Sequence, residues 1–193
     1  SARVADLSAM IASELQLSDE DIEIIRTAGR LHDIGKIGIR EEVLAKQGPL
    51  TPAEYEHVKD HVIIGTQILA PLAHLHGAIV CMRSHHERWD GKGYPNGLSG
   101  HEIPLASRVI LVADTIDAMT TDRPYRKRLP LEVVIAELKK CSGSQFDPEV
   151  VEHVVASVAA SFLITVGVET SPMPATMVVS DPGASRSGWA KKS

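Results

Sequence analysis

Apolar side chains recur at helical spacing along most of the sequence, and this pattern restricts the possible folds more than any other feature. Val4, Leu7, Ile11 and Leu15 lie three or four positions apart, so they fall on one face of a helix. Similar stripes return in most later segments. No segment alternates convincingly as a strand, apart from a weak apolar stretch at residues 177–179. The sequence therefore predicts an all-α protein.

Local start signals divide this pattern into separate helices. Ser18 is followed by three acidic residues, as expected of an N-cap and the first helical turn. Thr51 and Glu54 form a capping box around Pro52, which favours the first helical position. We expect a bundle of about six to eight helices. Its further helices lead into His85-His86, begin at Pro104, span residues 131–140 and begin at Pro148.

Composition excludes several classes of protein. The chain has 193 residues, enough to bury a core, and its formal net charge is −5, which does not favour DNA binding. Any recognition of phosphate must therefore be local. No apolar run reaches the roughly 18 residues of a membrane span, so none is predicted. Cys81 and Cys141 form no motif, which favours a reducing compartment and predicts a cytoplasmic protein.

Glycine and proline interrupt the helical pattern in two regions. Residues 89–100 are rich in glycine and include Pro95, which predicts a loop. From residue 161 onward, proline, glycine and serine become frequent and the apolar stripe fades. We therefore expect a domain over residues 1–160, followed by a loose, poorly ordered tail over residues 161–193.

Imidazole and carboxylate groups are placed on the expected inward helix faces or at helix ends. An adjacent His-Asp pair can give one metal ion an imidazole while its carboxylate bridges to a second ion. Asp114 follows an apolar run, where a buried carboxylate costs several kcal/mol unless it is paired or metal-bound. Lys36 lies one helical turn after Asp33 and can point toward the same cluster. The candidate metal ligands are His32, Asp33, His61, His85, His86 and Asp114.

Taken singly, these residues have ordinary interpretations. His61 alone is typical of a core or surface histidine, and Asp114 alone could pair with a basic side chain. Lys36 alone could be a solvated surface lysine, and Arg123 could belong to a solvated basic turn. The joint placement of all six candidate ligands favours a site for more than one metal ion over coincidence.

Three segments carry a family resemblance. Residues 31–38 read LHDIGKIG, residues 85–95 read HHERWDGKGYP, and residues 114–126 read DTIDAMTTDRPYR. In this order, with His61 between the first two, they closely resemble the HD-GYP family, a branch of the HD-domain metal-dependent phosphohydrolases. The resemblance covers roughly residues 1–155. It implies an HD-domain helical bundle with a metal site in its core.

The resemblance also implies an activity. HD-GYP proteins are phosphodiesterases that hydrolyse cyclic di-GMP to linear pGpG, with GMP as an alternative end product, in bacterial signalling. The six candidate ligands would hold two divalent ions, iron or manganese, with Asp33 as the bridging ligand. Lys36 would contact the phosphate or help to protonate the leaving oxygen. The implied substrate-binding residues are Gly93, Tyr94, Pro95, Arg123 and Arg126.

Departures from the family pattern keep other interpretations open. The family usually has a histidine just before the segment that begins at Ser1, and some members have a glutamate one turn earlier. We therefore expect an N-terminally truncated domain in which a third metal ion would lack ligands. One alternative is a degenerate sensor that binds cyclic di-GMP or a partner without cleavage. Another is an HD phosphohydrolase that acts on a different nucleotide. The loop with Tyr94 could also dock a partner domain such as a diguanylate cyclase (GGDEF) domain, and the resemblance implies an output domain that a sensory or receiver domain usually precedes.

Overall fold

The computed structural model describes residues 1–122 and 127–165, and within them the chain is helical, without a β-sheet. The all-α fold class predicted from the sequence is therefore confirmed. No helix among these residues has both the length and the apolar character needed to cross a membrane. The α-helices are α1 (Ala2–Glu14), α2 (Asp19–Leu31), α3 (Glu41–Leu44), α4 (Pro52–Leu69), α5 (His76–Arg83), α6 (Leu105–Thr120), α7 (Leu131–Cys141) and α8 (Pro148–Thr165). Short 3-10 helices are η1 (Ile34–Gly38), η2 (Ala73–Leu75) and η3 (Gly100–Glu102).

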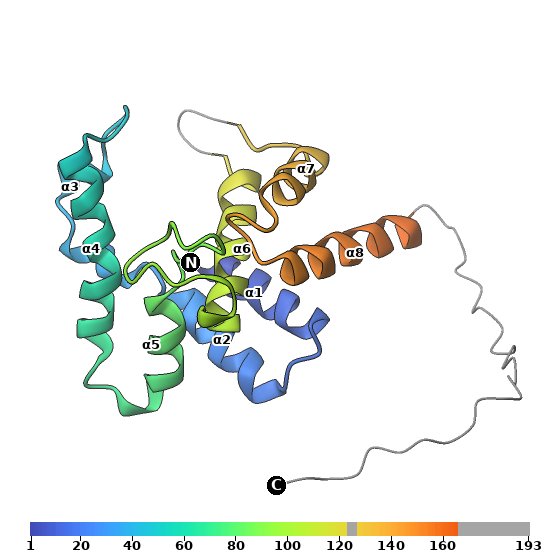
Figure 1. Ribbon diagram of the computed structural model, residues 1–193, viewed down its shortest axis with the longest axis horizontal. Coiled ribbons are helices and arrows are strands. Elements are labelled where there is room, and N and C mark those ends of the chain that lie inside the picture. The colour runs from blue at the N-terminus through green and yellow to red at the C-terminus, as the bar shows by residue number, and fades with distance from the viewer. Residues whose placement is uncertain (123–126, 166–193) are drawn as a thin grey trace, which may run out of the picture.

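Helix α6 runs through the middle of the bundle, with α1, α2 and α5 on one side and α7 and α8 on the other (Figure 1). Its residues from Val109 to Ala113 are all buried. A helix that is enclosed by neighbours has no solvent face, which explains why this segment is apolar without interruption. Asp114 follows directly, so α6 places a partly buried carboxylate next to this core, with its Oδ1 3.7 Å from Nε2 of His32.

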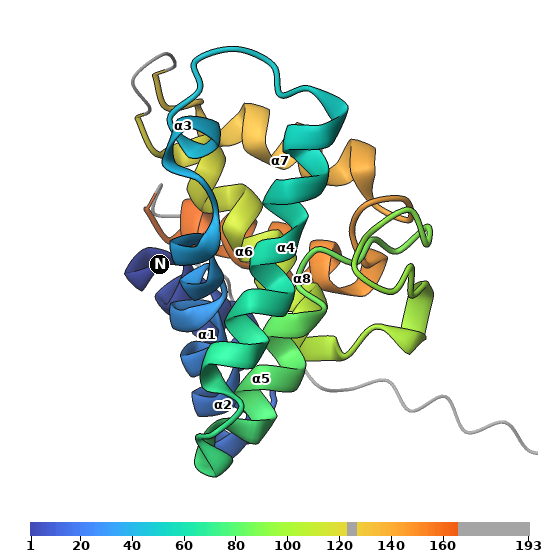
Figure 2. The same ribbon diagram turned by 90° about the vertical axis from the view of Figure 1, so that its left-hand side faces the viewer.

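Helix α4 packs against η1 and α5 on the side of the molecule away from α8, and this side faces the viewer in Figure 2. Two glycines permit this close packing. A Cβ atom at Gly35 would lie 1.8 Å from the carbonyl oxygen of His61, and one at Gly65 would lie 2.9 Å from the Met82 side chain. The absence of a side chain at Gly35 thus lets the segment after Asp33 pack against α4.

The predicted helix starts agree with the capping contacts. Ser18 accepts a hydrogen bond from the Asp21 amide at the start of α2, and Thr51 and Glu54 form the capping box of α4. The segment before His85 differs from the prediction, because η2 precedes α5 and α5 ends at Arg83. The His85-His86 pair therefore lies just beyond a helix end, where its side chains can turn into the bundle.

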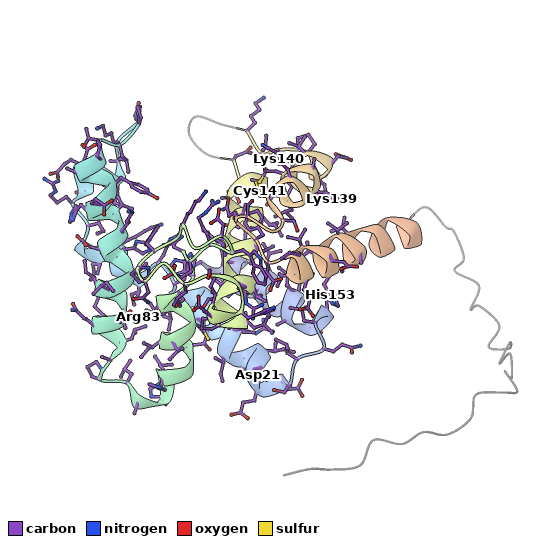
Figure 3. The ribbon with its side chains drawn as sticks, in the orientation of Figure 1. Asp21, Arg83, Lys139, Lys140, Cys141 and His153 are labelled. Carbon is purple, nitrogen blue, oxygen red and sulfur yellow. The ribbon has the colours of Figure 1, made fainter. Side chains whose placement is uncertain are left out.

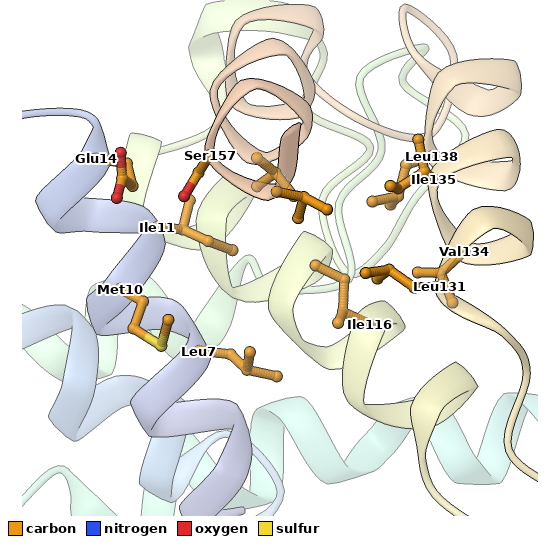
Figure 4. Close-up of a pocket in the computed structure, with 12 residues that line it drawn as sticks. Leu7, Met10, Ile11, Glu14, Ile116, Leu131, Val134, Ile135, Leu138 and Ser157 are labelled. Carbon is orange, nitrogen blue, oxygen red and sulfur yellow. The ribbon is translucent and has the colours of Figure 1, made fainter. Parts of the chain in front are cut away.

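The C-terminal helices are joined to the centre by a buried ion pair. Arg108 of α6 contacts Asp147, which also accepts the Glu149 amide at the start of α8. An apolar cavity of about 200 Å³ lies between α1, α6, α7 and α8 (Figure 4), and none of the candidate metal ligands lines it. Helix α8 continues to Thr165; residues 166–193, with the weak apolar stretch near residue 178, lie outside the described residues. The predicted boundary at residue 160 stays a prediction.

Candidate metal centre

Three buried histidines share one local geometry. The Nδ1 of His32 contacts the carbonyl oxygen of Gly29 at 2.6 Å, and that of His61 contacts the carbonyl oxygen of Val58 at 2.6 Å. His85 makes the same contact with the carbonyl oxygen three residues before it, that of Met82. A carbonyl only accepts, so each Nδ1 carries a proton and donates it. The lone pair of each ring is therefore on Nε2, the atom left for a metal ion.

The Nε2 atoms of His32, His61 and His85 are buried and make no hydrogen bond of normal geometry with the residues that the structure describes. A buried polar atom without a partner costs on the order of 1–3 kcal/mol. Three such atoms in one cluster fit a site where they coordinate a metal ion. The nearest ligand atoms of His61, His85 and His86 all lie within 4.8 Å of one another, which suits a shared metal ion.

The carboxylate of Asp33 lies between two of these imidazoles. Its Oδ2 is 3.4 Å from Nε2 of His32, and its Oδ1 is 3.7 Å from Nε2 of His61. Lys36 Nζ contacts the same Oδ2 at 2.6 Å. Burial would raise the pKa of Asp33, but His32 and Lys36 outweigh it and hold that pKa well below its usual range. Asp33 is thus an ionised carboxylate with one oxygen toward each histidine, as a bridging ligand requires.

Asp114 closes the cluster from the side of α6. Its Oδ1 lies 3.7 Å from Nε2 of His32, so His32 faces two carboxylates. Burial raises the pKa of Asp114, and the negative charge of Asp33 adds to this effect. Two carboxylates at one site favour a cation between them.

The protonation states of His61, His85 and His86 also suit metal binding, because metal ions bind neutral imidazole. Burial lowers the pKa of His61 and lowers that of His85 well below its usual value. The pKa of His86 falls to about 3, chiefly through burial. For His32, burial lowers the pKa, but the neighbouring Asp33 carboxylate outweighs it and the net shift is upward.

The loop after His86 is fixed to the site by a residue that sequence reasoning missed. Glu87 is 1% exposed, and its carboxylate accepts the backbone amides of Asn96 at 2.6 Å and Leu98 at 3.0 Å. Its position between the histidine pair and a glycine-rich segment could have indicated this role, because the backbone amides of a loop need hydrogen-bond acceptors. Gly93 packs so tightly on this turn that a Cβ atom would lie 2.4 Å from the Arg88 nitrogen.

Tyr94 brings the loop against the candidate ligands. Its ring stacks on that of His86, with centroids 4.8 Å apart and an angle of 28° between the planes. Gly93 and Pro95 flank this tyrosine, so the predicted substrate-binding segment lies beside the cluster. The other two predicted substrate-binding residues, Arg123 and Arg126, lie outside the described residues.

Comparison with known proteins identifies the family. The HD domain family model matches residues 1–150. The chain belongs to the HD domain family. HD-domain phosphohydrolases are metal-dependent, and the imidazole cluster agrees with this property.

Curated relatives and solved structures confirm the resemblance to the HD-GYP branch. The chain is 47% identical over 154 residues to a cyclic di-GMP phosphodiesterase of Thermotoga maritima, covering 78% of this chain and 41% of that protein. It is 40% identical over 149 residues to the 3'3'-cGAMP-specific phosphodiesterase 3 of Vibrio cholerae, covering 77% of this chain and 32% of that protein. The chain thus spans less than half the length of these relatives.

Two solved structures share the fold. A cyclic GMP-AMP specific phosphodiesterase from Vibrio cholerae superposes with a TM-score of 0.64 at 20% identity, over 85% of this chain and 44% of that one. An HD-GYP-type protein from Bdellovibrio bacteriovorus gives 0.66 at 19% identity, over 82% of this chain and 51% of that one. The predicted HD-domain helical bundle is therefore confirmed.

Proposed function

We propose that this domain is a metal-dependent phosphodiesterase that hydrolyses cyclic di-GMP to pGpG, with GMP as an alternative end product. The observation that carries the proposal is the set of three buried Nε2 atoms without a hydrogen-bond partner, two of which, those of His32 and His61, face the ionised Asp33 carboxylate. The relatives named as cyclic di-GMP phosphodiesterases, at up to 47% identity, support the choice of substrate. We assign the catalytic domain to residues 1–160.

The residues present fit a centre of two divalent ions, for which we propose iron or manganese. Mixed imidazole and carboxylate ligation suits both metals. When bound, such ions acidify water to give a nucleophile and neutralise charge on the phosphate. The proposed ligands are His32, Asp33, His61, His85, His86 and Asp114.

Lys36 provides the proposed polar contact with the scissile phosphate. Its ammonium is held by Asp33 at 2.6 Å, yet the side chain remains 43% exposed and can reach a bound ligand. There it stabilises the charge that develops on the phosphate oxygens as the bond from phosphorus to the leaving ribose oxygen breaks. It can also supply the proton that the leaving oxygen needs.

The loop around Tyr94 and the segment with Arg123 and Arg126 form the proposed substrate-binding edge. The Tyr94 phenol lies beside His86, and burial raises its pKa, so it remains a neutral hydrogen-bond donor. Gly93 and Pro95 fix the backbone on either side. We propose that this loop docks a GGDEF partner domain, and that a sensory or receiver domain is a second partner of the protein.

A second cyclic dinucleotide is also a candidate substrate. One relative at 40% identity is named for specificity toward 3'3'-cGAMP. We therefore include this dinucleotide as the second candidate substrate for the same site and the same reaction.

The test is hydrolysis by purified protein that has been reconstituted anaerobically with iron(II) or manganese(II). We expect cyclic di-GMP to be converted to pGpG, detected by chromatography. The Lys36→Met variant should retain its metal and lose activity by about 100-fold, because one transition-state contact is removed. If the fully metallated wild-type protein leaves both dinucleotides intact, the proposed function is wrong and the sensor alternative is favoured.

A further inference from the structure

A group of one cation and two tyrosines lies beside the proposed metal centre. Helix α4 carries Tyr55 and Lys59 one turn apart, and His61 follows two positions later. Lys59 Nζ is 4.8 Å from the centroid of the Tyr55 ring and 5.5 Å from that of Tyr94. Both distances are typical of cation–π contacts. The ammonium thus joins α4 to the loop beside the centre.

This group contacts a proposed metal ligand, His86, through the Tyr94 ring. Tyr94 stacks on His86 and Lys59 lies 5.5 Å from the Tyr94 ring, so both side chains would adjoin the groups next to a phosphate bound at the centre. In a cyclic dinucleotide, those groups are a ribose and its base. The position therefore suits recognition of a base and not of the scissile phosphate.

Tyr55 and Lys59 can each bind a further group from a ligand. Tyr55 is 47% exposed, which leaves ring surface for stacking. Lys59 donates one hydrogen bond to Glu56 at 2.7 Å, and an ammonium has three donors. Stacking of a base on an aromatic side chain contributes roughly 1–3 kcal/mol in single-stranded nucleic-acid complexes.

We propose that Tyr55 and Lys59 form a guanine-recognition subsite, an inference that rests on the proposed function. The base takes the place of the Lys59 ammonium over the Tyr55 ring, and the flexible lysine side chain moves to the edge of the base and donates to guanine O6 and N7. Adenine presents an amino donor in place of O6, which an ammonium cannot bond. Lys59 therefore selects guanine over adenine at this subsite, and so cyclic di-GMP over cyclic di-AMP.

The test compares kcat/KM for cyclic di-GMP, cyclic di-AMP and bis(p-nitrophenyl) phosphate, which has no base. In Lys59→Met, we expect activity on cyclic di-GMP to fall about tenfold more than activity on the base-free ester. The preference for guanine over adenine should narrow by a similar factor. Lys59→Arg should restore that preference, because a guanidinium also donates to O6 and N7. An unchanged ratio between the two dinucleotides in Lys59→Met would overturn the inference.

Lys140→Met is the matched control. Lys140 pairs with Glu137 three residues earlier, as Lys59 does with Glu56, and so the two substitutions remove the same charge from the same kind of pair. Lys140 lies on α7, on the other side of the bundle from α4 (Figure 3). We expect no change in substrate preference. A loss in Lys140→Met equal to that in Lys59→Met would assign the effect to net charge and overturn the inference.

A binding measurement separates this inference from the proposed function. If wild-type protein hydrolyses none of the three compounds, the proposed function fails, and equilibrium dialysis with cyclic di-GMP then tests the subsite directly. We expect Lys59→Met and Tyr55→Ala each to weaken binding by about tenfold, while Tyr55→Phe keeps the ring and the affinity. Equal affinity in all four proteins would overturn the inference.

Discussion

Each buried histidine of the cluster is oriented by a backbone carbonyl of its own chain segment. His32 and His85 bond to carbonyls near helix C-termini, where the last carbonyl groups need donors. One contact thus serves two purposes: it satisfies the helix end and points Nε2 into the cluster. His61 makes the same contact within α4. The three rings are therefore arranged before any ligand binds, which lowers the cost of ordering them on binding.

Replacing His85 by leucine should separate metal binding from folding. Manganese(II) at about 100 times its Kd should stabilise the wild-type protein by roughly 2.7 kcal/mol, because the ion binds only the folded state. His85→Leu should lose most of this gain, because one ligand is gone. Thermal unfolding with and without metal measures the difference.

His74→Leu is the control for this substitution, since His74 is exposed and does not belong to the cluster. It should keep the full response to manganese. A His85→Leu variant that responds to metal as the wild-type protein does would contradict the assignment of His85 as a ligand.

The candidate metal ligands could be predicted from the sequence, but the other residues around the site could not. The His-Asp pair, the double histidine and Asp114 were identified by residue type and by an unusual place in apolar helices. Glu87 and Lys59 were missed, because Glu87 binds loop amides nine and eleven residues away and Lys59 meets Tyr94 of another segment, contacts that only the folded chain creates. Tyr55 was missed because its role depends on this placement of Lys59. That the six candidates are ligands stays a prediction until a metal is observed.

Among the elements, the contact of η1 with α4 decides whether the cluster forms. Gly35 lies directly against the His61 carbonyl, so the segment that carries Asp33 and Lys36 is fixed relative to His61. Any side chain at Gly35 must separate the two elements. The geometry of the bridging carboxylate therefore depends on a residue without a functional group.

Gly35→Ala should destabilise the protein and weaken metal binding together. The added Cβ would lie 1.8 Å from a backbone oxygen, so the backbone must shift, at a cost of about 3 kcal/mol or more. Urea denaturation measures the loss of stability, and a manganese titration measures the loss of affinity.

Gly48→Ala is the matched control, because a Cβ there meets nothing within 4 Å. It should be neutral or stabilising by up to about 1 kcal/mol, through reduced freedom of the unfolded chain. Equal stability of Gly35→Ala and Gly48→Ala would contradict the role given to the η1–α4 contact.

Helix starts were predicted well and helix ends poorly, for a physical reason. N-caps are local, so Ser18 and the Thr51–Glu54 box could be identified from a few residues. The ends of α2 and α5 are completed by histidine side chains whose direction depends on the cluster. Helix α3 spans only residues 41–44, too short for an apolar period to reveal it.

For the whole molecule, the buried ion pair between Arg108 and Asp147 joins α6 to the C-terminal helices. The two side chains are 11% and 1% exposed, and the Arg108 guanidinium also lies 5.7 Å from the centroid of the Trp89 ring in the loop. The pair thus connects the bundle centre, α8 and the loop. The family match ends at residue 150, just after this connection.

Asp147→Asn should leave the Arg108 charge buried without compensation. We expect a loss of about 3–5 kcal/mol in the free energy of unfolding, measured by chemical denaturation. The double variant Arg108→Met with Asp147→Asn should be more stable than the single variant, because no charge is buried. A double variant that is less stable than the single variant would contradict this account.

The order of helices and the family could be predicted from the sequence, because motifs and apolar periodicity are local patterns that can be recognised without the folded structure. The arrangement that unites the site could not, since it depends on close backbone approach at Gly35 and Gly65 and on the enclosed position of α6. The predicted roles of Arg123 and Arg126 stay predictions, as these residues lie outside the described part of the chain.

The most direct test of the metal centre is anomalous X-ray diffraction from crystals of the manganese-loaded protein. We predict anomalous peaks within roughly 2 Å of the Nε2 atoms of His32, His61 and His85, and beside the Asp33 carboxylate. Fully loaded protein whose manganese peaks lie elsewhere, with these Nε2 atoms still without a ligand, would contradict the account.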